Sequence, residues 1–321
     1  MAAMLIASVL ALSCEKEKVS VREVISGDRI PVTVSVPSLE TKYTGTSGEA
    51  QVSDLQILVF RSDGTLDAYA KCEDGLSLEL DCTAGEKEFV AVVNGTDLSG
   101  ISSRSDMNGL KTVLSENVPG KMIMTGSVKQ NVTTGENEVF ITVSRLVARV
   151  SIAKVTNAIT SSAYADSPIK ITAIYLSNVT GDRPYMSVGT PSVWYNKFGT
   201  QADLPALLHS GKLSVEVPKG SSGNTTHYFY CFPNSTSKDS SSSVWCPRYT
   251  RLVVETEIAG QTYYYPVSFQ NIEANHRYHI RDLKITRLGS ESPDEPVQVG
   301  TVTVTIEVKG WDEGSDSEVT I

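Results

Sequence analysis

Short runs in which aliphatic and polar residues alternate are the dominant pattern of this 321-residue chain. Two of the clearest are residues 30–36 and residues 302–308, and turn sequences such as Ser62-Asp63-Gly64 separate many of the runs. Successive side chains of a strand point to opposite faces of a sheet, so each run can bury one face and leave the other polar. The pattern predicts an all-β protein of the sandwich type.

Further strands are expected along both halves of the chain, at 55–60, 89–93, 122–125, 139–143, 146–152, 169–176, 227–232, 251–257 and 276–285. Residues 257–261 predict a hairpin turn that leads into a strand at 263–265. One segment predicts a helix, because Ser103 can cap it and Met107, Leu110, Val113 and Leu114 then share a face.

Length and composition narrow the class of protein. A chain of 321 residues is long enough for about two domains. Hydrophobic residues at 40% and charged residues at 20% fit a packed fold and not a disordered or membrane-embedded one. The net charge of −9 disfavours nucleic acid and anionic membrane surfaces as partners, since neither would have its phosphates neutralised.

The N-terminal residues resemble an export signal. Residues 4–13 are apolar and uncharged, and the run is too short to span a bilayer. Small residues precede Cys14 and a polar stretch follows it, which resembles a bacterial lipobox. We therefore expect a signal peptide over residues 1–13 and a lipid, of the palmitate type, on Cys14. The alternative is a buried N-terminal strand with a chance cysteine.

Four further cysteines are Cys72, Cys82, Cys231 and Cys246. An even number suits an exported protein, and pairing within each half predicts the disulfides Cys72–Cys82 and Cys231–Cys246. Other connectivities and buried thiols stay open. The spacing lacks the Cys-x-x-Cys pattern of zinc sites, so we expect no metal.

The first and last strong strands have the same pattern. Aliphatic side chains occupy every second position, as Ile30, Val32, Val34 and Val36 in one strand and as Val302, Val304, Ile306 and Val308 in the other. Either strand could therefore fill the same apolar groove, the one left if the first strand were removed. Pro31 and Pro37 indicate an edge position for the first strand, because proline lacks an N–H for the ladder. The simpler alternative is two ordinary edge strands of two sandwiches.

A cleavable loop follows the first strand. Residues 38–49 are polar and glycine-containing, and Lys42 is the basic residue among them. Cleavage between Lys42 and Tyr43 by a trypsin-like protease would separate the chain from the lipid on Cys14. It would also remove the first strand and open a groove for residues 302–308 of a neighbour. Such head-to-tail contacts do not close, so they form a fibre. Residues 289–296 are interpreted as a hinge before the last strand.

Several segments together resemble the fimbrillin family, the type V pilins of Bacteroidales. They are the lipobox at Cys14, residues 52–60 followed by Asp63-Gly64, residues 85–94, residues 145–150, and the terminal strands joined at Trp311. The resemblance implies two transthyretin-like β-sandwich domains in tandem with a C-terminal donor strand segment that includes Trp311. It also implies delivery to the outer membrane as a lipoprotein, maturation by a trypsin-like or gingipain-like protease, and assembly with other pilus subunits into an adhesive fimbrium.

These expectations divide the chain into a signal peptide (1–13), a propeptide with the first strand (14–42), an N-terminal domain (43–145), a C-terminal domain (146–290) and a linker with the donor strand (291–321). The family's maturation site is usually an arginine, whereas Lys42 occupies the corresponding loop here. Cleavage at Arg29 would leave the first strand attached. An anchor subunit that keeps its lipid therefore stays an alternative role.

Signatures of catalysis are missing from the sequence, which contains no Gly-x-Ser-x-Gly, His-Glu-x-x-His or phosphate-binding glycine loop. We expect no enzyme activity, catalytic residue or cofactor. His276 and His279 would face opposite sides of one strand and could not share a metal. The rival function is a surface glycan-binding lipoprotein, in which Trp194, Tyr195, Tyr263 and Tyr264 would stack on sugar rings.

Overall fold

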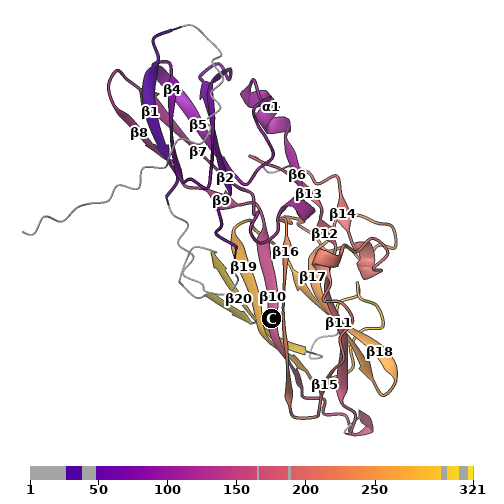
Figure 1. The fold of residues 1–321 in the computed structure, drawn as a ribbon. Coiled ribbons are helices and arrows are strands. Elements are labelled where there is room, and N and C mark those ends of the chain that lie inside the picture. The colour runs from indigo at the N-terminus through magenta and orange to yellow at the C-terminus, as the bar shows by residue number, and fades with distance from the viewer. Residues whose placement is uncertain are drawn as a thin grey trace, which may run out of the picture.

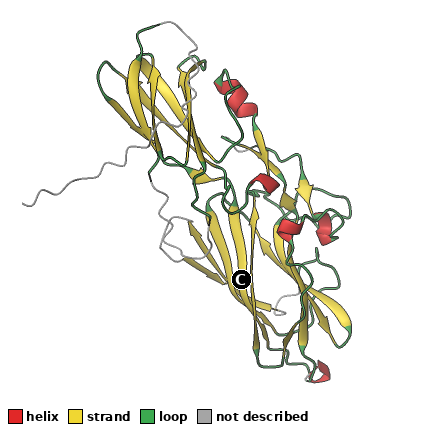
Figure 2. Cartoon of the chain, in the orientation of Figure 1, coloured by secondary structure: helices red, strands yellow, loops and turns green. Residues whose placement is uncertain are grey.

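The computed structural model describes residues 27–37, 48–164, 166–186, 189–297, 302–310 and 317–320. These residues form an elongated molecule of two β-rich halves that follow each other along its length (Figure 1). Strands dominate, and helix is limited to short segments (Figure 2). The predicted all-β class is confirmed. None of the helices in the described part of the chain is long and apolar enough to cross a membrane.

Two sheets pack face to face in the first half. A three-stranded sheet has the order β4 (Ser77–Cys82), β1 (Ile30–Ser35) and β8 (Asn137–Phe140). A five-stranded sheet has the order β3 (Leu66–Glu73), β2 (Asp54–Arg61), β5 (Gly85–Val93), β7 (Met124–Val132) and β9 (Ser144–Arg145). Their facing aliphatic side chains form one core cluster, since alternate residues of each strand point inward.

A five-stranded and a four-stranded sheet form the second half. One has the order β16 (Ser222–Cys231), β10 (Ala148–Asn157), β19 (His276–Ile285), β20 (Val302–Gly310) and β21 (Ser317–Thr320). The other has the order β15 (Val215–Val217), β11 (Ile169–Ser177), β17 (Thr250–Ile258) and β18 (Gln261–Phe269). Ala259 and Gly260 both have positive φ, 49° and 79°, in the predicted hairpin turn between β17 and β18.

Short strands connect the two halves. β6 (Lys111–Val113) of the first half pairs with β13 (Asp182–Pro184) of the second, and β12 (Val179–Thr180) pairs with β14 (Trp194–Tyr195) beside them. The second core cluster extends from the interior of the second half to the outer face of the five-stranded sheet. Both faces of β2 are therefore buried, and the halves share apolar contacts.

The predicted helix is shorter than expected. α1 spans Arg104–Gly109 and has the predicted cap at Ser103, whose hydroxyl accepts a hydrogen bond from the backbone N–H of Asp106. Met107 is buried, but Val113 is exposed and lies in β6. Pairing with β13 overrides the helical periodicity beyond Gly109. The other helical segments are 3₁₀ turns, namely η1 (Leu114–Glu116), η2 (Ser162–Tyr164), η3 (Lys197–Gly199) and η4 (Ala206–Leu208).

Candidate functional site

The first strand fills a strand-shaped space inside its sheet. β1 pairs antiparallel with β4 on one side and parallel with β8 on the other. β4 and β8 are neighbours in this sheet only through β1. Removing β1 would therefore expose two unpaired backbone edges at once, together with the apolar floor beneath. We call the space that β1 occupies the β1 slot.

The apolar face of this strand is completely buried. The relative exposures of the four aliphatic residues are 6% for Ile30, 1% for Val32, 0% for Val34 and 3% for Val36. Pro31 on the opposite face is exposed, and Thr33 is half-buried. The predicted alternation is thus present in the fold, and the buried face contacts the core of the first half.

The prediction that β1 is an edge strand is wrong, because β1 lies between β4 and β8. Its pairing with β8 begins at Val32, so Pro31 lies where only β4 adjoins the strand. A missing N–H is tolerated at such a position, where the sheet has a neighbour on one side alone. Pro31 therefore marks the point where the pairing with β8 ends, and it does not indicate that β1 lies at the edge of the sheet.

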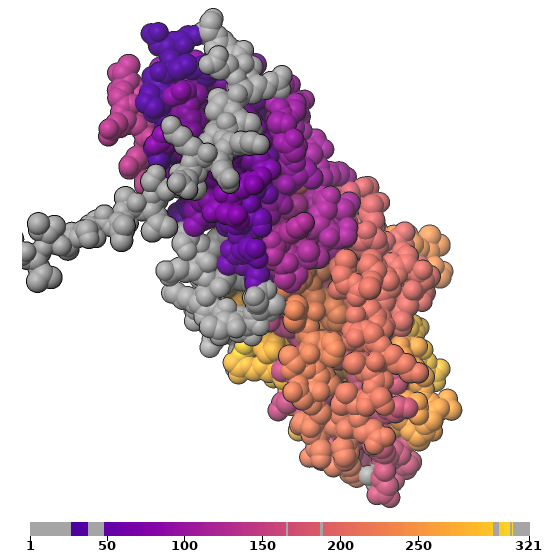
Figure 3. Space-filling view, viewed as in Figure 1, coloured from indigo at the N-terminus to yellow at the C-terminus, as the bar shows by residue number. Residues whose placement is uncertain are grey.

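The candidate donor strand is folded into its own half. β20 pairs antiparallel with β19 from Ile285↔Val302 to His276↔Gly310, and β21 covers its other edge. Val304 and Ile306 are each 3% exposed and belong to the core of the second half. Val302 and Val308 are only half-buried. Figure 3 shows the β20 segment in yellow on the flank of the second half, far from the indigo β1 segment at the end of the first.

The segment before β20, interpreted from sequence as a hinge, is attached to the second half. Ser290 and Tyr264 exchange two backbone hydrogen bonds of 3.0 and 2.8 Å. Asp294 accepts a hydrogen bond from Nη1 of Arg251 at 2.9 Å and also forms an ion pair with Arg248. Both arginine side chains are 1% exposed, so their charges need a buried carboxylate. We call Asp294 with these two arginines the Asp294 clamp.

Sequence reasoning missed the Asp294 clamp. Asp294 is one of several acidic residues in a polar segment, and Arg248 and Arg251 lie in the region of β17, more than forty residues earlier. Asn178 adds a hydrogen bond of 2.9 Å from its Nδ2 to Oδ1 of Asp294. No short-range pattern links these residues, since the tertiary fold alone brings them together.

The chain after the predicted cleavage loop is anchored at the junction of the two halves. Glu49 is 3% exposed, and its Oε1 accepts hydrogen bonds from Nη1 of Arg149 at 3.0 Å and from the hydroxyl of Tyr230 at 2.6 Å. Its backbone oxygen accepts a hydrogen bond of 3.0 Å from Nε of Arg145. Both arginines and the tyrosine belong to strands of sheets other than that of β1, so this anchor does not depend on the first strand.

Four predicted site residues lie outside the described part of the chain. They are the lipidation site Cys14, the cleavage pair Lys42 and Tyr43, and Trp311 of the donor segment.

The predicted disulfides are not formed in this structure, in which Cys82, Cys231 and Cys246 are free thiols, and the pairing stays a prediction. Cys72 lies on β3 and Cys82 on β4, in different sheets, which separates residues that are close in sequence. Burial raises the pKa of Cys82 to about 11 and the pKa of Cys231 to about 12. Cys231 is buried at the end of β16, whereas Cys246 lies half-exposed in a loop.

The aromatic residues of the rival interpretation do not form one exposed surface. Tyr195 and Tyr263 pack against the core of the second half, and Tyr264 packs against a small cluster on β11 and β17. Trp194 instead lines a cavity. In the described residues, histidine, cysteine, aspartate and glutamate side chains form no group of three or more that could hold a metal ion.

Comparisons with known proteins agree with the fold and the strand arrangement. Residues 31–172 match the model of the family described as major fimbrial subunit protein (FimA). None of the curated proteins matches the sequence.

Solved structures share the fold over most of the chain. A fimbrilin (FimA) from Porphyromonas gingivalis is 19% identical, with a TM-score of 0.66 over 88% of this chain and 97% of that one. A candidate cell adhesion protein from Bacteroides eggerthii is 16% identical, with a TM-score of 0.67 over 89% of this chain and 97% of that one. The tip fimbrial protein Mfa3 of P. gingivalis, crystallised with a C-terminal truncation, is 14% identical, with a TM-score of 0.53 over 88% of this chain and all (100%) of that one. Residues 31–172 are thus similar to the major fimbrial subunit family, and the chain shares the fold of the fimbrilin.

Proposed function

We propose that this chain is a structural subunit of a cell-surface fimbrium that polymerises by donor-strand exchange after proteolytic removal of β1. The observation that carries the proposal is the β1 slot, which has a backbone edge on each side and a continuous apolar floor. A strand of matching alternation could replace β1 there by β-augmentation. β20 has that alternation, with its aliphatic side chains on one face.

The energies involved make an empty slot unstable. Burying four aliphatic side chains contributes about 1.5–3 kcal/mol each. The sum of roughly 6–12 kcal/mol is comparable to the net stability of a domain, about 5–15 kcal/mol. A subunit that has lost β1 would therefore recruit a replacement strand.

Burial also favours transfer of β20 into the slot of a neighbour. In its own half, β20 buries Val304 and Ile306 fully, whereas Val302 and Val308 are half-exposed. All four positions of the β1 slot are at most 6% exposed. The transferred strand would thus bury two more aliphatic side chains, which helps to offset the contacts that it loses beside β19.

Cleavage at Lys42 would leave the rest of the subunit intact. Glu49 and its partners Arg149 and Tyr230 hold the chain soon after the cleavage site. Gly48 reinforces this point, because its backbone oxygen accepts a hydrogen bond of 2.8 Å from the N–H of Gly120. The chain from Gly48 onward would then remain anchored at the junction while the propeptide, residues 14–42, departs with the lipid on Cys14. Replacing Cys14 with alanine should abolish labelling by a palmitate probe, and normal labelling would show that the lipid lies elsewhere.

A peptide experiment separates the two roles of β20. Because Val304 and Ile306 are buried in their own half, charged substitutions in the whole chain would damage folding as well as exchange. A peptide with the sequence of residues 302–310 avoids this problem. It should bind a chain that begins at Tyr43 and should not bind the uncut chain, in which β1 fills the slot.

The two faces of the peptide provide matched controls. Aspartate at the positions of Val304 and Ile306 would put charge on the apolar floor, where an unpaired carboxylate costs several kcal/mol, so binding should be lost. Aspartate at the positions of Thr303 and Thr305 should leave binding within a few-fold. Equal binding of both peptides to the cleaved chain, or equal binding of the parent peptide to cut and uncut chains, would exclude strand exchange through the β1 slot.

A further inference from the structure

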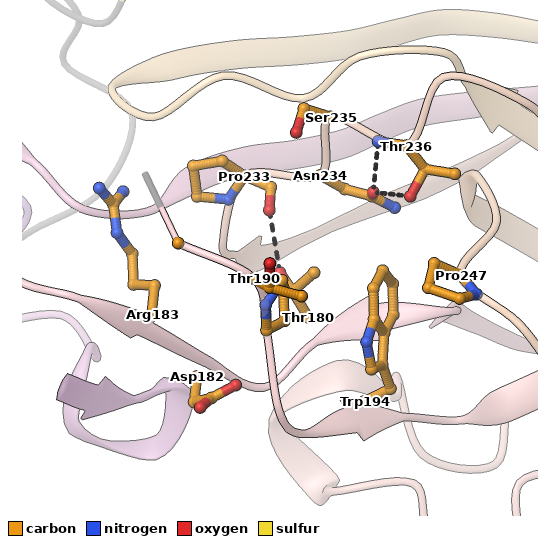
Figure 4. Close-up of a pocket in the computed structure, with 12 residues that line it drawn as sticks. Thr180, Asp182, Arg183, Thr190, Trp194, Pro233, Asn234, Ser235, Thr236 and Pro247 are labelled. Atoms are coloured by element: carbon orange, nitrogen blue, oxygen red, sulfur yellow. Dashed lines mark hydrogen bonds between the residues drawn. The ribbon is translucent and has the colours of Figure 1, made fainter. Parts of the chain in front are cut away.

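A cavity of about 370 Å³ opens on the second half of the molecule, away from β1 and β20. This volume is within the range of small-ligand sites, about 300–1,000 Å³. Strands β12, β13 and β14 form one side and the loop after β16 forms the other (Figure 4). The lining residues include Thr180, Asp182, Arg183, Thr190, Trp194 and Ser235.

Trp194 presents an aromatic ring to this cavity. The residue pairs with Thr180 between β14 and β12, and its ring makes an edge contact with Trp245 at 5.7 Å between ring centroids. The guanidinium of Arg248 lies 5.5 Å from the ring of Trp245 and supports it. Unlike Tyr195, Trp194 is half-buried without belonging to a hydrophobic core cluster. Its position is thus held by contacts that leave the ring available to a ligand.

The polar wall opposite is preformed. The Oδ1 of Asn234 accepts hydrogen bonds from the backbone N–H and the hydroxyl of Thr236, which are drawn in Figure 4. The hydroxyl of Thr180 donates to the backbone oxygen of Pro233 at 3.1 Å. In the described part of the chain, the hydroxyls of Thr190 and Ser235 have no hydrogen-bond partner. A ligand could therefore use them without reorganising the wall, which lowers the entropic cost of binding.

Arg183 adds a positive charge at the other end of the cavity from Trp194 (Figure 4). Its Nη1 donates to the backbone oxygen of Leu146 at 2.7 Å and its Nε to that of Pro184 at 3.2 Å. Within the described residues no carboxylate pairs with this guanidinium. Burial lowers the pKa of Arg183 to about 10, since the charge is desolvated without a counter-ion.

The neighbouring Asp182 does not supply that counter-ion. Its carboxylate accepts hydrogen bonds from Nζ of Lys111 at 2.9 Å and from the backbone N–H groups of Ser192 and Val193 at 2.7 and 2.9 Å. The negative charge of Asp182 is therefore neutralised by Lys111 of β6 and not by Arg183. The cavity combines a flat aromatic ring, two available hydroxyls and one cation without an ion-pair partner.

We propose that this cavity binds a sugar residue that carries a carboxylate, of the uronic acid class. The apolar face of the pyranose ring would stack on Trp194, its hydroxyls would bond Thr190 and Ser235, and its carboxylate would pair with Arg183. This binding activity goes beyond assembly into a fibre and does not depend on it, because none of the lining residues belongs to β1 or β20.

The test uses the full chain with two probes that differ in one group, methyl glucuronide and methyl glucoside. Saturation-transfer NMR and titration calorimetry should show the glucuronide binding at least tenfold more tightly. Arg183→Gln should bring the two affinities together, and Arg183→Lys should restore part of the difference. Trp194→Ala should abolish binding of both probes. Tyr228→Ala, at a 41% exposed aromatic on β16, is the matched control and should change neither affinity.

Thermal unfolding and circular dichroism would establish that each variant is folded. If Arg183→Gln failed to fold, two other measurements would still test the proposal. They are the ratio of the glucuronide and glucoside affinities of the wild-type chain, and the loss of binding in the Trp194→Ala variant. Equal affinities of the wild-type chain for the two probes, no saturation transfer from the glucuronide, or unchanged binding by a folded Trp194→Ala variant would overturn the proposal.

Discussion

The carboxylate of Asp294 lies 2.9 Å from Nη1 of Arg251, a side chain that is only 1% exposed. Arg251 is the second residue of β17, whereas Asp294 lies in the segment that leads to β20. The pair therefore links the segment before the candidate donor strand β20 to β17, which lies in the other sheet of the same half. In the proposed mechanism this contact keeps β20 close to its own half until a neighbour's slot is empty.

Replacing Asp294 with asparagine should loosen that attachment. The substitution removes the negative charge shared by Arg248 and Arg251, although Arg251 keeps its ion pair with Asp239. Leaving a buried polar group such as Arg248 without its partner costs about 1–3 kcal/mol. Hydrogen exchange of the amides of residues 302–310 should become faster than in the wild-type chain. Glu291→Gln, an exposed site in the same segment, is the control. Unchanged exchange in Asp294→Asn would mean that β20 is held by its sheet contacts alone.

Charging the buried face of β1 should mimic cleavage. Val34 is 0% exposed, so aspartate at this position would be forced out of the slot at a cost of several kcal/mol. The uncut Val34→Asp chain should then form oligomers that resist denaturing gel electrophoresis without boiling, even when no protease is present. Thr33→Asp, on the half-buried opposite face, should stay monomeric. A monomeric, fully stable Val34→Asp chain would contradict the role of the β1 slot.

Thiol labelling should follow burial. Cys82 and Cys231 are buried and their raised pKa values keep the thiols protonated and unreactive at neutral pH. Cys72 and Cys246 are only partly buried, so they should react first with an alkylating reagent in the native chain. Mass mapping after unfolding without a reductant should find label on all four residues. Unlabelled Cys72–Cys82 or Cys231–Cys246 pairs would instead reveal the disulfides expected from sequence.

Acid should weaken the junction between the halves through Asp182. Burial raises the pKa of this carboxyl, but hydrogen bonds from Ser192, Val193 and Lys111 outweigh it and lower the pKa to about 2, from 3.8 for an ordinary aspartate. A depressed folded-state pKa contributes stability above the unfolded value, and this contribution is lost as the pH falls from about 4 to 2.

The melting temperature of the wild-type chain should accordingly fall more steeply over this interval than that of Asp182→Asn, which cannot ionise at this position. Above pH 5 the variant should be the less stable of the two. Parallel curves for the two proteins would show that the Lys111–Asp182 ion pair does not contribute to stability.

The strands were largely predictable because their signal is local. Alternation at Ile30, Val32, Val34 and Val36 reports which face is buried, whatever lies on the other side of the core. The cap at Ser103 was predictable for the same reason, since capping involves residues three positions apart. The end of α1 was not, because Val113 pairs with Asp182 of the other half and that partner is distant in sequence.

The sequence by itself determined the strand faces, the capped start of α1 and the matching alternation of β1 and β20. Only the tertiary structure decided that β1 is central in its sheet, that β20 is folded beside β19, and that Asp294 pairs with Arg248 and Arg251. The physical reason is the range of the interactions. Side-chain periodicity is a property of neighbouring residues, whereas strand order and buried ion pairs depend on which distant segments the whole core brings into contact.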